Sequence, residues 1–237
     1  MNSKAVFYFK KFEVRHSASS MKVGTDAVLL GAWANTDETK VILDIGTGCG
    51  VIALMLAQRT SEDAIIDAID IDEQSCEEAY LNFTTSPWPD KLGVVHTSLQ
   101  NFHSEKHYDL IVSNPPYFTN SYKPERLTRI HARHTTQLDA LTLISAVKKL
   151  LHKAGKFCVV LPFTEGLEFS SLCRANGLYC TRKFSVRGRT HKPIERWLLE
   201  FQFEEKEVEQ GEIIIHDVGD AWAASYRALT KDFYLKN

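Results

Sequence analysis

The sequence predicts an α/β fold, with a doubly wound and mostly parallel sheet that has helices on both faces. From residue 41 onward, short apolar runs rich in branched residues alternate with helical segments, which is the pattern of strands buried between two helix layers. A glycine-rich turn at 44–50, DIGTGCG, joins the first run to the first helical segment. Near the C-terminus, residues 196–204 alternate apolar and polar side chains, and this period of two indicates an antiparallel strand.

The parallel part of the sheet is expected to contain five strands. These are the apolar runs at 41–45, 64–70, 92–97, 108–112 and 156–161. Helices are expected between them at 51–59, 73–83 and 138–151. The second helix must end before Pro87. The third has apolar residues at three- and four-residue spacing, which marks an amphipathic helix.

Two C-terminal segments, 178–186 and 196–204, are expected to form an antiparallel strand pair joined by the basic linker RGRTHKP. With the five parallel strands they make a Rossmann-like sheet of seven. EIIIHD at 212–217 is a candidate for one more short strand, and 221–229 for a short helix.

A single domain is expected, because 237 residues suit one α/β core better than two. No apolar run approaches the ~20 residues that a membrane-spanning helix needs, and the N-terminus lacks the apolar core of a secretory signal. The five cysteines are odd in number and contain no C-x-x-C pair. We therefore expect neither a disulfide framework nor a zinc site, and a cytoplasmic location.

The glycine-rich turn has the pattern D-x-G-x-G-x-G, with Asp44, Gly46, Gly48 and Gly50. Ligands of open α/β sheets bind at the carboxyl ends of the strands. Glycines allow close approach to the backbone, and the following helix N-terminus favours an anionic group. A dinucleotide fingerprint would need Gly or Ala where this chain has Val51. The turn instead resembles the loop of class I S-adenosylmethionine (SAM) methyltransferases; a purely structural turn is the alternative.

Asp70 ends the second strand, twenty residues after Gly50. A carboxylate there can accept both ribose hydroxyls of a cofactor, as the corresponding residue does in the resembling class. Asp72 competes for this role but suits the N-cap of the next helix better. Where such enzymes often place an acidic residue near the adenine, this chain offers Ser98 or Gln100.

The stretch SNPPYFTN follows the fourth strand, beside the glycine loop. An exocyclic amine becomes nucleophilic as its nitrogen turns tetrahedral, and two acceptors aimed at its N–H groups favour that form. The side-chain carbonyl of Asn114 and the backbone carbonyl of Pro115 can supply them, and Asn114 is also expected to contact the cofactor. Tyr117, with Phe118 beside it, offers a flat face for an extruded base. The combination resembles amino-methyltransferases, which modify adenine in nucleic acids or glutamine in release factors.

Six stretches together resemble the bacterial tRNA(Val) (adenine-37-N6)-methyltransferases. They are Met21 to Trp33, LDIGTGCG, SNPPYF, ARHT at 132–135, RTHKPIERWLLEF at 189–201 and DFYL at 232–235. The resemblance implies a class I methyltransferase fold, SAM as cofactor, and N6-methylation of adenine 37 beside the anticodon of tRNA(Val). It also implies that residues 1–40 cover the cofactor and that 41–162 form its binding core. The methionine moiety of SAM would then be lined by Lys22, Gly24, Thr25 and Asp26.

The net charge of −2 conceals segregation, because residues 1–22 carry +4, 120–134 carry +3 and 182–196 carry +5. A basic face would suit a polyanion such as tRNA; otherwise these are solvated charges that never meet. Phosphate contacts are expected after the N-P-P-Y turn, from Arg126, Arg129 and Arg133. Others are expected on the basic hairpin of 178–204, from Arg187, Arg189, Lys192 and Arg196.

Two alternatives remain open beside the tRNA enzyme. Glutamine methylation of a release factor would need a helical substrate domain, but only about 40 residues precede the first strand. A non-catalytic RNA-binding module would not need the intact Asn114–Tyr117 turn. We expect no metal, since His103 and His107 lack a third ligand and methyl transfer from SAM needs none. Neither a membrane nor an obligatory protein partner is expected.

Overall fold

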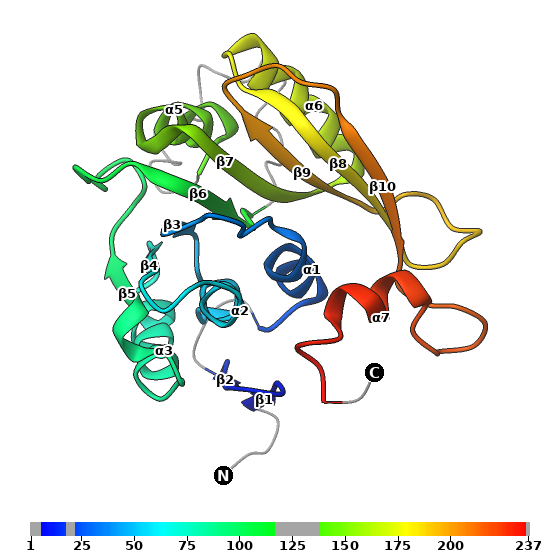
Figure 1. Ribbon diagram of the computed structural model, residues 1–237, viewed down its shortest axis with the longest axis horizontal. Coiled ribbons are helices and arrows are strands. Elements are labelled where there is room, and N and C mark those ends of the chain that lie inside the picture. Colours follow the sequence, from blue (N-terminus) through cyan, green and yellow to red (C-terminus); the bar gives the residue numbers. More distant parts are fainter. Residues whose placement is uncertain (1–5, 18–21, 117–137, 236–237) are drawn as a thin grey trace, which may run out of the picture.

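The computed structural model describes residues 6–17, 22–116 and 138–235, and most of their strands join one eight-stranded sheet (Figure 1). Its order is β10-β8-β9-β7-β6-β3-β4-β5. The five parallel strands are β3 (Val41–Ile45), β4 (Ile65–Asp70), β5 (Leu92–His96), β6 (Tyr108–Ser113) and β7 (Leu151–Pro162). The chain thus confirms the predicted parallel core.

The antiparallel pair is also present, as β8 (Tyr179–Arg187) and β9 (Arg196–Gln202), with β9 antiparallel to β7 as well. The predicted count of seven strands is corrected to eight. The additional strand β10 (Glu209–Ile214) overlaps the candidate strand at 212–217, begins three residues earlier, runs parallel to β8 and forms the sheet edge. Gly211 lies against Phe184, where a Cβ atom would approach the ring to 2.4 Å. A glycine inside a strand weakens the sequence signal for it, so the start of this strand is harder to predict than its apolar end.

Helices cover both faces, as the sequence predicts (Figure 1). One core contains side chains of α1 (Thr25–Trp33), α2 (Val51–Arg59) and α3 (Glu73–Thr84). The other contains those of α5 (Ala140–Leu150) and α6 (Phe163–Ala175). A 3-10 turn, η2 (Pro89–Lys91), precedes β5. Within β3, Ile42 faces the first core while Leu43 and Ile45 face the second, so both faces of this central strand are buried.

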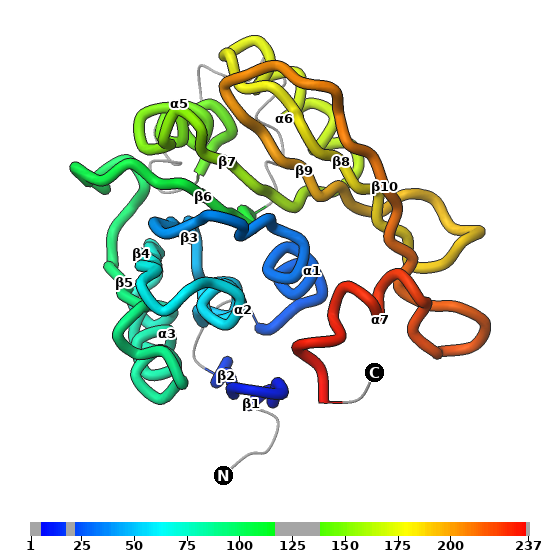
Figure 2. The backbone as a smooth tube through the Cα atoms, in the orientation of Figure 1, coloured from blue at the N-terminus to red at the C-terminus, as the bar shows by residue number. Residues whose placement is uncertain are grey.

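The two ends of the described chain meet beside α1 and α2. A hairpin of β1 (Val6–Tyr8) and β2 (Glu13–Arg15) is followed by the first core helix, and α7 (Ala224–Thr230) closes the chain. Figure 2 shows the blue hairpin and the red C-terminal stretch side by side, joined by a bridge between Phe9 and Tyr234. Across the described residues, every helix is too short or too polar to cross a bilayer.

Candidate active site

A cavity of about 260 Å³ opens at the carboxyl edge of the sheet, where the strand order changes direction between β3 and β6. This is the switch point at which open α/β sheets bind ligands. Its polar wall includes Gly46 and Gly48 after β3, Asp70 at the end of β4, and Asn114 after β6. Its apolar wall comes from Ala27, Ile45, Val51, Ile52, Ile69, Ile71, Leu99 and Leu138. Strands that are far apart in sequence thus deliver the predicted motifs to one place.

The three glycines of the loop have left-handed backbones, with φ of +73° at Gly46, +55° at Gly48 and +82° at Gly50. They differ in what a side chain would meet. A Cβ atom at Gly46 or Gly48 would meet no atom within 4 Å, whereas at Gly50 it would lie 2.4 Å from Cε1 of Phe83. The first two therefore keep the cavity open to a ligand, and Gly50 lets α2 pack against α3.

Asp70 is held rigidly between two backbone N–H groups. Its Oδ2 accepts from the amide of Gly48 at 2.8 Å, and its Oδ1 accepts from the amide of Asp72 at 2.9 Å. Asp72 is itself the N-cap of α3 and accepts from the amide of Ser75 at 3.0 Å. The sequence argument that Asp72 caps the helix is confirmed. The carboxylate of Asp70 keeps unused lone pairs on both oxygens and faces the cavity.

Asp44 lies beneath the glycine loop and not on the cavity wall. It is fully buried, and its Oδ2 accepts from the hydroxyl of Thr47 at 2.7 Å. Burial raises the pKa of the Asp44 carboxyl to about 7, and the neighbouring charge of Asp70 adds to the rise. Asp44 was expected among the cofactor contacts; in the described structure it instead supports the loop through Thr47.

The pH dependence of stability should report the burial of Asp44. Its carboxyl titrates near 4 in an unfolded chain and near 7 in the folded protein, so the folded state holds the proton more tightly. The stability that this site contributes is therefore complete below about pH 4 and is lost as the pH rises to about 7. The loss is on the order of 4 kcal/mol.

Asp44→Asn should remove this dependence, because the amide is uncharged and its oxygen can still accept from Thr47. Urea unfolding of both proteins at pH 5 and pH 8 measures it, and the variant should gain stability over the parent as the pH rises. A stability difference that is equal at the two pH values would contradict the burial argument.

The segment before β3 contributes one wall of the cavity through Lys22 and Ala27. The other residues implied by the family resemblance lie nearby but do different things. Gly24 is the N-cap of α1 and Thr25 its first residue, and neither is part of the cavity wall among the described residues. Asp26 forms an ion pair with Arg196 at 2.9 Å, which ties the start of α1 to the start of β9.

The far end of the cavity is formed by the residues that follow β5. Ser98 and Gln100 both line it, as expected, together with Leu99. Ile71, which directly follows β4, also lines the cavity and is 48% exposed despite being aliphatic. Sequence reasoning missed it, and the available signal was a branched apolar residue between Asp70 and Asp72. Ile71 and Leu99 give this end of the cavity two aliphatic side chains.

The N-P-P turn lies at the opposite end. The hydroxyl of Ser113 donates to the carbonyl of Ile45 at 2.9 Å and fixes the end of β6 against β3. Asn114 and Pro116 then line the cavity, while Pro115 is buried behind them. The predicted contacts Tyr117, Phe118, Arg126, Arg129 and Arg133 fall outside the described residues.

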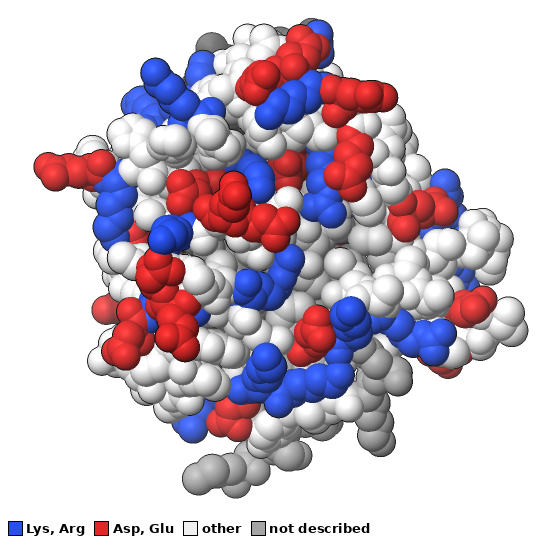
Figure 3. All heavy atoms as spheres, in the orientation of Figure 1, with Lys and Arg blue, Asp and Glu red and all other residues white. Residues whose placement is uncertain are grey.

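Two of the predicted phosphate contacts on the hairpin are engaged with acidic partners. Arg187 pairs with Glu212 at 2.6 Å and Arg189 pairs with Asp220 at 3.1 Å. Lys192 is exposed, and the ion pairs of the described residues do not include it. On the face shown in Figure 3, Lys and Arg side chains are interspersed with Asp and Glu over most of the surface, and a run of basic side chains crosses its lower part.

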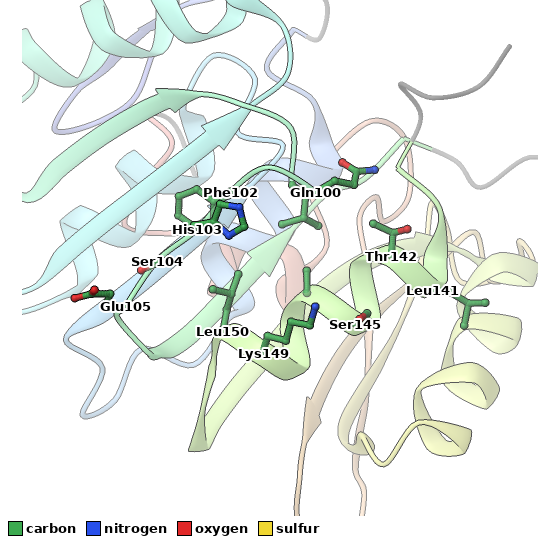
Figure 4. A pocket seen from close by; sticks show the side chains of 12 residues that line it. Gln100, Phe102, His103, Ser104, Glu105, Leu141, Thr142, Ser145, Lys149 and Leu150 are labelled. Atoms are coloured by element: carbon green, nitrogen blue, oxygen red, sulfur yellow. The ribbon is translucent and has the colours of Figure 1, made fainter. Parts of the chain in front are cut away.

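A larger cavity of about 750 Å³ adjoins the first, and Leu99 and Gln100 line both. Figure 4 shows it between the β5–β6 connection, which contributes Phe102 and His103, and α5, which contributes Thr142 and Lys149. Neither the glycine loop nor Asn114 reaches it, so the chemistry belongs to the smaller cavity. Among the described residues, no three His, Cys, Asp or Glu side chains are grouped closely enough to hold a metal ion.

Solved structures share this architecture. A "predicted O-methyltransferase", protein Atu636 from Agrobacterium tumefaciens, matches with a TM-score of 0.68 at 16% identity, over 88% of this chain and 96% of that one. The glycopeptide N-methyltransferase MtfA, complexed with S-adenosyl-L-methionine, matches with a TM-score of 0.57 at 11% identity, over 80% and 98% of the two chains. Residues 11–172 match the family model of the methyltransferase small domain. The fold and the pocket define a class I, SAM-dependent methyltransferase.

Proteins of similar sequence identify the family within this class of methyltransferases. A protein from Aeromonas salmonicida is 42% identical over 236 residues, covering 100% of both chains. Another from Pseudoalteromonas translucida is 40% identical over 230 residues, covering 97% of this chain and 98% of that one. Both are named tRNA1(Val) (adenine(37)-N6)-methyltransferase. The chain belongs to this family, which confirms the resemblance seen in Met21–Trp33 and the other motifs.

Proposed function

We propose that this protein transfers the methyl group of SAM to N6 of adenine 37 in tRNA1(Val). One observation carries the proposal beyond family membership: the glycine loop and Asn114 line a single cavity at the switch point of the sheet. The shared cavity supports the proposal, because a loop suited to a cofactor and a side chain suited to accept from an amine border the same space.

The residues present fit the cofactor. Gly46 and Gly48 leave open space that a Cβ atom would otherwise enter, and the Asp70 carboxylate, fixed by Gly48 and Asp72, can accept the two ribose hydroxyls. Ile71 and Leu99 line the same cavity and would enclose the adenine ring, with Ser98 and Gln100 at its polar edge. Lys22 also lines the cavity and would meet the carboxylate of the methionine moiety.

SAM, when bound, supplies an electrophilic methyl group on a sulfonium centre. The protein must then orient the exocyclic amine of the adenine toward this methyl group. The side-chain carbonyl of Asn114 and the backbone carbonyl of Pro115 accept from the two N–H groups of the adenine and stabilise the positive charge that develops on nitrogen. Pro115 has no N–H of its own, and its burial restricts the turn so that the acceptors are aimed in advance. No strong base is needed, because the methylated ammonium loses its proton to water.

A methyl-transfer assay tests the proposal. Labelled SAM is incubated with the protein and unmodified total tRNA, and the RNA is then digested to nucleosides. Label should appear as N6-methyladenosine. Label that appears in protein and not in RNA would contradict the proposal.

A further inference from the structure

Phe163 lies at the same edge of the sheet as Asn114, one strand away. It directly follows β7, which is the parallel neighbour of β6. At this edge the last residue of β7, Pro162, is the register partner of Arg196, where antiparallel β9 begins. The amide of Phe163 donates to the carbonyl of Glu195 at 3.1 Å. Hydrogen bonding thus fixes the start of α6 to β9 beside the active site.

An aromatic stack is built around this residue. The ring of Phe163 stacks on that of Trp197, with centroids 5.7 Å apart and planes at 27°. The ammonium of Lys183 lies 3.9 Å from the centre of the Trp197 ring. Gly166 permits the close approach of α6, since a Cβ atom there would lie 2.7 Å from Cδ1 of Trp197. The stack is therefore formed by the chain itself, without a ligand.

The outer end of the stack is open to solution. Phe163 is 40% exposed, and Leu167, one helical turn later, is 41% exposed. The exposed apolar surface of Phe163 and Leu167 does not contribute the free energy that its burial would give. The structure already holds Phe163 on one side through Trp197, so the uncovered part of the ring is available to a flat ligand.

The chemistry at the stack favours a nucleobase over a protein surface. A base stacks on an aromatic ring whatever its identity, and Lys183 adds positive charge that suits a phosphodiester backbone. Lys183 forms none of the ion pairs found within the described part of the chain, and Lys192 on the same hairpin is exposed. The Asn114 turn and Phe163 follow neighbouring strands at one edge of the sheet, so an RNA strand that presents its adenine to Asn114 and runs along this edge would meet Phe163.

We propose that Phe163, backed by Trp197 and flanked by Lys183, is a second stacking site of the enzyme and takes the nucleotide next to the methylated adenine. This proposal rests on the proposed function. Phe163 here binds substrate and takes no part in methyl transfer itself.

The test compares Phe163→Ala, Phe163→Trp and the control Tyr80→Ala. Tyr80 is an aromatic residue on α3 that is 60% exposed. We expect Phe163→Ala to raise the Kd for unmodified tRNA by roughly 5- to 150-fold, the range that corresponds to loss of one base–aromatic stack. Its single-turnover rate at saturating tRNA should stay within about threefold of the parent. Phe163→Trp should keep the parental affinity for tRNA, because tryptophan also offers a flat ring. Tyr80→Ala should bind tRNA as the parent does.

Each contrary outcome has a distinct meaning. If the parent methylates tRNA and Phe163→Ala binds it equally well, the stacking site is wrong while the proposed function stands. If the parent makes no N6-methyladenosine, the proposed function itself fails. A loss of S-adenosylhomocysteine affinity equal to the loss of tRNA affinity would show general damage and overturn the assignment. A change of sedimentation in Phe163→Ala without a change in tRNA affinity would show a protein interface instead.

Discussion

Asn114→Ala is expected to lower kcat by about 10²- to 10³-fold, the scale of losing one preorganised polar group that meets transition-state charge. The side-chain carbonyl is the acceptor that favours the tetrahedral amine, and alanine leaves a gap at the end of β6. The backbone should not move, because Ser113 still donates to Ile45 at 2.9 Å. Single-turnover rates at saturating tRNA measure the effect.

The matched control is Asn101→Ala, an exposed asparagine that lies in neither cavity wall. It should turn over at the parental rate. Affinity of Asn114→Ala for S-adenosylhomocysteine, measured by calorimetry, should fall far less than kcat, because only the contact from Asn114 is lost and the glycine loop and Asp70 are intact. If Asn114→Ala keeps the parental rate, Asn114 does not present the amine.

Gly50→Ala is expected to produce the largest loss of stability among substitutions in the glycine loop. The position has φ of +82°, and the new Cβ would lie 2.4 Å from the buried ring of Phe83. The left-handed backbone costs about 1–2 kcal/mol for a residue with a Cβ, and overpacking a core adds about 1–3 kcal/mol. A total of ~2–5 kcal/mol should lower Tm by roughly 5–20 °C for a chain of this length.

Gly48→Ala provides the matched comparison. Its backbone is also left-handed, with φ of +55°, but a Cβ atom there meets no atom within 4 Å. Thermal unfolding should show a loss of only about 1–2 kcal/mol, while the methyl group enters the cavity and weakens S-adenosylhomocysteine binding by tenfold or more. Should Gly50→Ala unfold within about 2 °C of the parent, the packing role assigned to Gly50 is wrong.

The local features of this fold were accessible from sequence because short-range rules determine them. The parallel strands are continuous apolar runs, the glycine loop has a fixed spacing, and Asp72 caps α3 three residues ahead of its partner Ser75. Two helices, α1 and α6, were not predicted because they lack these local signals. All residues of α1 from Ala27 to Trp33 are buried, so it lacks the amphipathic stripe that marks a helix. In α6, Gly166 and a serine pair weaken the helical pattern.

The site was harder to predict wherever it depends on contacts between distant residues. The sequence shows no acidic partners close to the arginines of the basic hairpin. In the structure, Glu212 and Asp220, which are 25 and 31 residues away, pair with Arg187 and Arg189. Arg196 likewise meets Asp26 across 170 residues, joining two of the segments that carry the family resemblance. No local pattern reports such pairs. The same holds for the stack of Phe163 on Trp197, which the pairing of β7 with β9 creates.

The most direct test of the proposed activity uses a defined RNA. Transcripts of tRNA1(Val) with adenine or guanine at position 37 are incubated with the protein and labelled SAM, and the methylated nucleotide is mapped by nuclease digestion and mass spectrometry. We expect one N6-methyladenosine at position 37 in the first transcript and none in the second. Equal methylation of both transcripts, or a methyl group at another adenine, would contradict the proposed function.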